Sequence, residues 1–264
     1  MNNTLKSALI QTEVVWEEPT KNLNNFSEKI EKMDPDVDLI ILPELFSTGF
    51  TMDADRVAEE MDGITVKWML EKSNNRQCVI LGSVLIKEGG KFYNRMIVTF
   101  PNGEIKHYDK RHLFTYAKED KVFSQGEDRL VFNYKGFNIC PLICYDLRFP
   151  VWARNTEYID ILIYSANWPK PRIKAWDTLL KSRAIENMCY TIGVNRVGTD
   201  KNNLIFPGHS AAYNCLGETI LEFDENEEAE KTVVLKKDHI TEIRNKFRFL
   251  DDRDEFKIKT SLKN

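Results

Sequence analysis

Three side chains of reactive type stand directly beyond runs that have the character of β-strands. Glu44 follows the run LIILP, Lys110 follows EIKHYD, and Cys144 follows ICPLI. Pro43 has no N–H to offer a sheet ladder, so it ends the first run and leaves Glu44 at the strand's carboxyl edge. Ligands of open α/β sheets gather beyond the carboxyl ends of the strands. We therefore expect these three side chains to converge, although they lie far apart in the chain.

A thiol, a carboxylate and an ammonium at one place suit nucleophilic acyl transfer. A cysteine is a strong nucleophile once a base has taken its proton. Glu44 is able to act as that base, and Lys110 is able to stabilise the oxyanion of a tetrahedral intermediate. Taken singly, each residue has a commoner explanation: a capping glutamate, a solvated lysine and an inert buried cysteine. A cysteine–histidine pair formed in space is the rival chemistry.

The elements that must position these residues are predicted from the apolar patterning. Continuous runs such as LIIL, VILGSVLI and IDILIYSA are typical of strands covered on both faces. Amphipathic spacing predicts helices over residues 20–33, 65–77 and about 171–190. Hairpins are predicted at Asn102-Gly103 and around residues 214–217. Strands are predicted at residues 8–15, 39–42, 79–86, 137–143, 159–165, 191–197 and 232–235.

Three stretches of the chain together resemble the signature of a known enzyme family. ILPELFSTGF, YDKRHLF and LICYDLRFP are similar, in order and in spacing, to the Glu–Lys–Cys motifs of the nitrilase superfamily of carbon–nitrogen hydrolases. The resemblance extends from Ala8 to about Phe256. It implies an α/β fold, the four-layer α-β-β-α sandwich, as a single domain over residues 1–264. It also implies a homodimer or higher homo-oligomer, with residues 236–264 as a C-terminal extension that packs on the partner subunit.

The same resemblance implies a role for each matching residue. Glu44 is the general base, Cys144 the nucleophile and Lys110 the electrostatic stabiliser. The backbone N–H of Tyr145 is the second oxyanion donor. These assignments predict a covalent thioester intermediate and require neither a metal nor an organic cofactor.

The family also has a further glutamate near the catalytic lysine, shortly before a glycine. Glu119 in AKEDKVFSQG fits that place between Lys110 and Gly126, with Asp120 as the neighbouring alternative. A second carboxylate there would hold the lysine charged and oriented, or position the substrate.

Within the superfamily the chain looks most like the omega-amidase branch, on the stretches FSTGFTM, CYDLRFPVW and SANWPKPRIKAWDTLLKSRAIENMCYTIGVNRVGTD. Omega-amidases hydrolyse 2-oxoglutaramate and 2-oxosuccinamate to the keto dicarboxylic acid and ammonia. Such small anions favour a pocket with an arginine for the carboxylate. Arg172 is the first choice, with Arg148 and Arg196 as alternatives, and each can equally belong to a structural ion pair. Phe50 and Trp168 are expected as apolar walls of the substrate site, or as core residues.

Two other interpretations stand beside this one. The chain can be another small aliphatic amidase or an N-carbamoyl amino-acid hydrolase of the same superfamily. It can also be a catalytically silent interaction protein built on the same fold. The intact Glu44, Lys110 and Cys144 speak against silence, because loss of function usually removes one of them.

Composition excludes several classes of protein. The 264 residues carry 37 Lys and Arg against 41 Asp and Glu, a net charge of −4, which is too balanced for a nucleic-acid binder. With 42% hydrophobic and 11% aromatic residues the chain is not disordered. No apolar run approaches the ~20 residues of a membrane helix, and the N-terminus lacks a signal-peptide core. Five cysteines without a CxxC pair favour a reduced, cytoplasmic protein, and scattered histidines predict no metal site. The expected partner is a small-molecule amide.

Overall fold

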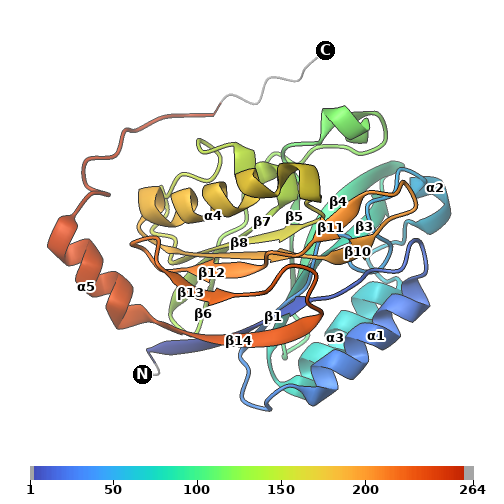
Figure 1. The fold of residues 1–264 in the computed structure, drawn as a ribbon, viewed down its shortest axis with the longest axis horizontal. Coiled ribbons are helices and arrows are strands. Elements are labelled where there is room, and N and C mark those ends of the chain that lie inside the picture. Colours follow the sequence, from blue (N-terminus) through green and yellow to red (C-terminus); the bar gives the residue numbers. More distant parts are fainter. Residues whose placement is uncertain (1–2, 259–264) are drawn as a thin grey trace.

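Two six-stranded β-sheets packed face to face, with helices on their outer faces, form the fold (Figure 1). The computed structural model describes residues 3–258. Helices α1 (Pro19–Lys32) and α3 (Ile64–Arg76) cover the first sheet, and α4 (Ile173–Asn187) covers the second. The layers therefore run α-β-β-α, as predicted, in a single domain.

The first sheet has the strand order β14-β1-β2-β3-β4-β5, and the second has the order β13-β12-β9-β8-β7-β6. The strands of the first sheet are β1 (Thr4–Gln11), β2 (Leu39–Ile41), β3 (Val79–Glu88), β4 (Lys91–Thr99), β5 (Ile105–Asp109) and β14 (Ala229–Lys236). Those of the second are β6 (Phe132–Tyr134), β7 (Phe137–Ile143), β8 (Ile161–Ala166), β9 (Tyr190–Asn195), β12 (Ala211–Tyr213) and β13 (Thr219–Glu222). A separate two-stranded ribbon is formed by β10 (Val197–Thr199) and β11 (Ile205–Pro207).

Strand direction collects the reactive residues at one edge. In the first sheet β1, β2 and β3 are parallel, whereas β4 and β5 form an antiparallel hairpin, so β5 runs the same way as β2. Glu44 and Lys110 therefore leave the same edge of that sheet. In the second sheet β7, β8 and β9 are parallel, which puts Cys144 and Asn167 at a common edge.

The alternation of side chains along each strand explains the unbroken apolar runs. In β2 and its extension, Leu39 and Ile41 point into the core between the two sheets, whereas Ile40 and Leu42 point into the core beneath α1 and α3. Both faces of the strand are buried, so every position is apolar. This packing holds the strand ends, and with them the reactive side chains, in rigid positions.

Most predicted elements are present with shifted ends. β7 has the predicted bounds, and both predicted hairpins form, between β4 and β5 and between β12 and β13. The first strand is displaced: it covers Thr4–Gln11 instead of residues 8–15. Its pairing with β14 begins at Thr4, and beyond Gln11 the chain turns away, so that Glu13 bridges to Val197. The interval 171–190 divides into a short 3₁₀ turn, η4 (Lys170–Arg172), and α4.

The chain after β14 forms α5 (Lys237–Phe247) at one end of the sandwich (Figure 1). Ile240 of this helix is buried, and Arg244 donates hydrogen bonds to Met188 and Asp160. That this segment packs on a partner subunit stays a prediction, and residues 259–264 of the predicted extension lie outside the described residues. Within residues 3–258, the helices are all too short or too polar to cross a bilayer.

Candidate active site

Glu44 is turned inward by the chain just beyond β2. The N–H of Leu42 still bonds to Leu81, but Leu45 has a positive φ of 45° and its N–H donates to Oγ of Ser83 at 2.8 Å. This bend leaves the Glu44 side chain fully buried between the two sheets. Its Oε2 accepts the backbone N–H of Asn167 at 2.8 Å, so the carboxylate is held from the second sheet as well.

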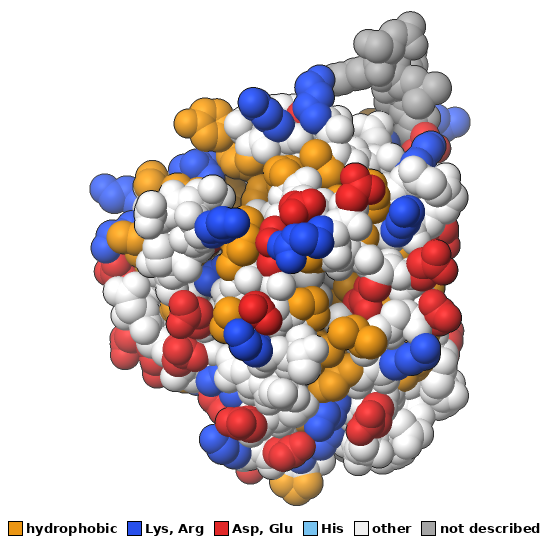
Figure 2. Space-filling model, turned by 90° about the vertical axis from the view of Figure 1, so that its right-hand side faces the viewer, with side chains coloured by type: hydrophobic (Ala, Val, Ile, Leu, Met, Phe, Trp, Pro, Cys, Tyr) orange, Lys and Arg blue, Asp and Glu red, His pale blue; other side chains and the backbone are white. Residues whose placement is uncertain are grey.

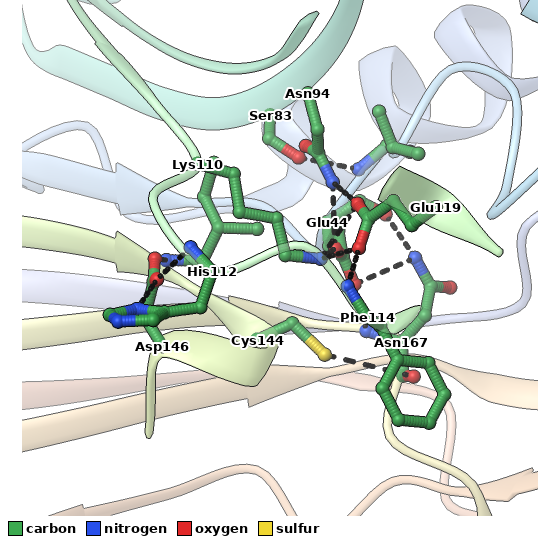
Figure 3. Close-up of polar contacts among 12 residues, drawn as sticks. Glu44, Ser83, Asn94, Lys110, His112, Phe114, Glu119, Cys144, Asp146 and Asn167 are labelled. Atoms are coloured by element: carbon green, nitrogen blue, oxygen red, sulfur yellow. Dashed lines mark hydrogen bonds and ion pairs between the residues drawn. The ribbon is translucent and has the colours of Figure 1, made fainter. Parts of the chain in front are cut away.

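Lys110 reaches two buried carboxylates. Its N–H extends the β4–β5 ladder to the carbonyl of Asn94, and its Nζ lies 2.7 Å from Glu44 Oε1 and 2.9 Å from Glu119 Oε1. All three charged side chains are at most 1% exposed. Figure 3 shows the ammonium between the two carboxylates. A buried ammonium shared in this way is fixed in both charge and position.

The sequence alone left Glu119 and Asp120 as alternatives for the second carboxylate, and the structure brings Glu119 to Lys110. Glu119 begins a 3₁₀ turn, η2 (Glu119–Lys121), and also accepts the N–H of Phe114. Asp120 instead forms an ion pair with Lys121 at 3.3 Å and not with Lys110.

Burial and charge shift the pKa values of this cluster. Burial raises the pKa of Glu119, against the opposing effect of the Lys110 charge. Burial disfavours the Lys110 ammonium, but the carboxylates of Glu119 and Glu44 outweigh it and raise the pKa of Lys110 above its usual value. Lys110 is therefore charged throughout the neutral range.

Two asparagines complete the cluster, and neither was predicted from the sequence. Asn94, in the interior of β4, donates through Nδ2 to Glu44 Oε1 at 2.8 Å and to Glu119 Oε1 at 3.3 Å. Asn167, just beyond β8, donates through Nδ2 to the carbonyl of Glu44. Asn167 carries the same signal as the three reactive residues, a polar side chain directly after a strand. For Asn94 the signal is an asparagine inside a strand, a position that this residue usually avoids.

Cys144 opens a 3₁₀ turn, η3 (Cys144–Arg148), with a positive φ of 42°. A non-glycine residue takes this conformation only where its surroundings hold it. The half-buried thiol faces the cavity, with Sγ 3.9 Å from the carbonyl oxygen of Asn167 (Figure 3). Burial and the nearby Glu44 raise the pKa of the thiol well above its usual value, and Lys110 pulls it the other way.

Tyr145 is the second residue of η3, so its backbone N–H belongs to the first turn, where such groups have no partner within the helix. Tyr145 also lines the cavity that Cys144 faces. The predicted oxyanion donor thus stands beside the predicted nucleophile. No histidine of residues 3–258 lines this cavity, so the rival cysteine–histidine pair does not form.

The cavity in front of Cys144 has a volume of about 540 Å³. The predicted substrate residues Phe50, Trp168 and Arg172 all line it, together with Arg148. Figure 2 looks at the edge of the molecule that carries β10 and β11, and hydrophobic side chains gather there around a hollow. The remaining aromatic lining comes from Trp16, Phe114, Tyr116 and Phe206.

Two of the three candidate arginines face the cavity without an acidic partner. The guanidinium of Arg172 stacks over Phe114 at 5.0 Å, and that of Arg148 over Trp168 at 4.9 Å. Within residues 3–258, neither has a carboxylate within the 4.0 Å of an ion pair. Burial lowers the pKa of Arg172, as expected for a cation that lacks a counter-ion. Arg196 is different: it is fully buried, donates to the carbonyls of Val14 and Val197, and is not part of the lining.

A four-layer sandwich whose strand ends bring a thiol, two carboxylates and an ammonium to one cavity defines a class of enzymes, the hydrolases of carbon–nitrogen bonds. The family model of the carbon-nitrogen hydrolases matches residues 6–245. The chain belongs to this family, within the nitrilase superfamily, and its substrate is accordingly a small amide-type molecule.

Individual relatives are similar over almost the whole chain. The omega-amidase YafV of Escherichia coli strain K12 is 39% identical over 96% of this chain and 98% of its own length. The 2-oxoglutaramate amidase of Bacillus subtilis is 35% identical over 81% of this chain and 84% of its own. A crystal structure of a CN-hydrolase superfamily protein from Xanthomonas campestris, with an arsenic adduct in its active site, is 38% identical. Its TM-score is 0.95, over 97% of this chain and 99% of that one.

Proposed function

We propose that this protein is an omega-amidase, which hydrolyses the distal amide of 2-oxoglutaramate or 2-oxosuccinamate to the keto dicarboxylic acid and ammonia. The observation that carries the proposal is the pair Arg172 and Arg148, which face the catalytic cavity without an acidic partner. A cation left unpaired in a partly buried wall is suited to an anionic ligand. The two relatives named above for this activity support the same substrate class.

The first half of the reaction forms a thioester. The raised pKa of the Cys144 thiol keeps it protonated at neutral pH, so a base must remove the proton during attack. Glu44 takes this proton as the sulfur bonds to the amide carbon. The oxyanion is stabilised by the Lys110 ammonium and the N–H of Tyr145. Glu44 then gives the proton to the departing nitrogen, the carbon–nitrogen bond breaks, and ammonia leaves.

The second half hydrolyses the thioester. Glu44, again a carboxylate, takes a proton from a water molecule as the water oxygen attacks the thioester carbon. The carbon–sulfur bond breaks, Cys144 recovers its proton from Glu44, and the dicarboxylic acid is released. Glu119 accepts from Lys110 with both carboxylate oxygens, and so it holds the ammonium in place through both halves.

The cavity walls fix the orientation of the substrate. A guanidinium over an aromatic face keeps its edge free for two parallel hydrogen bonds to a carboxylate. Phe50, whose ring lies 5.3 Å from Lys110 Nζ, and Trp168 provide apolar walls for the short carbon chain. With its carboxylate on Arg172, a short amide places its distal carbonyl toward Cys144.

Ammonia release from a panel of amides tests this proposal. The panel contains 2-oxosuccinamate, 2-oxoglutaramate, a neutral amide of the same length and an N-carbamoyl amino acid. The expected result is the highest kcat/KM on the two keto-acid amides, abolished in Cys144→Ala. Cys140→Ala is the matched control, because Cys140 is a buried cysteine of β7 outside the cavity. Preference for the neutral amide or the carbamoyl amino acid would replace the omega-amidase assignment, and no hydrolysis of any of them would refute it.

A further inference from the structure

The carboxylate of Asp146, two residues after Cys144, is fully buried. Among residues 3–258, no lysine or arginine lies within ion-pair distance of it. It is held instead by four hydrogen-bond contacts. Oδ2 accepts the hydroxyl of Tyr108 at 2.7 Å and the N–H of Ile143 at 3.0 Å. Oδ1 accepts the N–H of His112 at 3.0 Å and contacts Nδ1 of the same histidine at 2.8 Å (Figure 3).

The direction of these hydrogen bonds is determined by the neighbours of Tyr108. Its hydroxyl oxygen already accepts two donors, the indole N–H of Trp152 at 3.1 Å and the backbone N–H of Arg111 at 3.0 Å. A hydroxyl has a single proton, so that proton is directed at Asp146. The N–H groups of Ile143 and His112 also only donate. Asp146 therefore accepts a hydrogen bond from Tyr108, Ile143 and the backbone N–H of His112, and the direction of its fourth contact follows the tautomer of the His112 ring.

These donors come from the two chain segments that carry the proposed oxyanion stabiliser and the nucleophile. Tyr108 and His112 flank Lys110 at the end of β5, and Ile143 immediately precedes Cys144. Asp146 thus closes the turn around Cys144, where φ is positive, and ties that turn to the lysine segment of the other sheet. The ring of His112 stacks on Phe149 at 3.7 Å and braces the same junction.

We propose that Asp146, with Tyr108 as its orienting donor, is a positioning residue that sets the placement of Lys110 relative to Cys144. It acts through these residues, because neither Asp146 nor Tyr108 lines the cavity. The inference rests on the roles proposed above for Cys144 and Lys110, and it holds for any amide substrate.

The test compares Asp146→Asn with Asp160→Asn. The amide that replaces the Asp146 carboxylate keeps the shape of the side chain but turns an N–H₂ group toward N–H donors. The contacts that join the Lys110 segment to the turn at Cys144 are therefore weakened. A displacement of about 1 Å at a reacting centre costs about 10²-fold in rate, so kcat is expected to fall by about that factor with KM nearly unchanged. The pH profile of Cys144 alkylation by iodoacetamide is expected to move to higher pH. The reason is that the Lys110 ammonium lowers the pKa of the thiol, and this effect weakens when the two groups lie farther apart.

Asp160 supplies the matched control. It is likewise a buried carboxylate, and it accepts from Arg244, Lys237 and the N–H of Asn138. It precedes β8 and lies beside Asn138, at the opposite end of β7 from Cys144. Asp160→Asn is expected to lower the melting temperature while leaving kcat and the alkylation profile as in the wild type.

The outcomes separate positioning from general stability. A folded Asp146→Asn with wild-type kcat and alkylation profile overturns the inference, and so does a loss of kcat in both variants in proportion to their melting temperatures. If Asp146→Asn does not fold, Tyr108→Phe decides: lower kcat at unchanged KM supports the inference, and wild-type kcat overturns it. A wild type that hydrolyses no amide would refute the proposed function instead, and alkylation would still report the coupling of Lys110 to Cys144.

Discussion

Removal of the Lys110 ammonium strands two buried carboxylates and also deletes the proposed oxyanion stabiliser. In Lys110→Ala, Glu44 and Glu119 would share only the hydrogen bonds from Asn94, Asn167 and the N–H of Phe114. Removing one partner of a buried ion pair costs roughly 3–5 kcal/mol. For a domain of this size each kcal/mol lowers Tm by roughly 2–4 °C, so a drop of about 10 °C is expected.

This loss of stability should depend on pH in a definite direction. Burial already raises the pKa of Glu119, and without the lysine charge it rises further. A group whose folded pKa is raised favours the folded state at low pH, and that contribution is lost as pH rises through the folded pKa. The Tm difference between Lys110→Ala and the wild type is therefore expected to be larger at pH 8 than at pH 5. Scanning calorimetry across that range measures it.

The catalytic effect is separable from the stability effect. Loss of one oxyanion donor lowers kcat by about 10²–10³-fold, and this loss should persist at a temperature where the variant is fully folded. Glu119→Gln is the companion variant, because it keeps the lysine while weakening its anchor, and its kcat should fall less. A folded Lys110→Ala with near-normal kcat would refute the stabilising role. A Tm difference that does not vary with pH would refute the claim that the variant is destabilised by a buried carboxylate without a counter-charge.

Three further outcomes are expected. Iodoacetamide should label Cys144 before the other four cysteines, because Cys144 lines the cavity whereas Cys78, Cys140, Cys189 and Cys215 are buried; peptide mapping that finds the label elsewhere would contradict the nucleophile assignment. Arg172→Ala should raise KM for 2-oxosuccinamate by about 10- to 100-fold, the effect of one lost charged hydrogen bond, and leave KM for the neutral amide unchanged. An equal rise of KM for both substrates in steady-state assays would show that Arg172 has a structural role instead. The predicted homodimer should appear in sedimentation velocity, and the fraction of dimer should fall when the chain is cut after Phe247. An unchanged dimer fraction in the shortened chain would show that the C-terminal extension does not belong to the interface.

The sequence predicted the positions along the chain where chemistry is possible. Pro43, the hairpin before Lys110 and the apolar strand before Cys144 are local signals, and each depends on residues within a few positions of the reactive side chain. Local patterning also predicted the strands covered on both faces and hence an α/β domain, whereas the four-layer sandwich was implied by the family resemblance. These features are readable from one sequence because strand periodicity and strand termination are short-range properties.

The partners of each reactive group were decided only by the tertiary structure. Asn94 and Asn167 reach Glu44 from β4 and β8, which belong to different sheets, so no local pattern connects them. The choice of Glu119 over its neighbour Asp120 depends on which side chain a short 3₁₀ turn directs inward.

The same holds for the arginines, which are equivalent by type. Packing encloses Arg196 among backbone carbonyls and leaves Arg148 and Arg172 at the cavity wall. In the sequence Asp146 is only an acidic residue near the cysteine. Its proposed positioning role depends on hydrogen bonds from Tyr108 and His112, which belong to the Lys110 segment of the other sheet. Burial, charge and hydrogen-bond partners are long-range properties of the packed sheets. The sequence by itself therefore determined where the reactive groups leave their strands, and the packing of one sheet on the other decided what surrounds them.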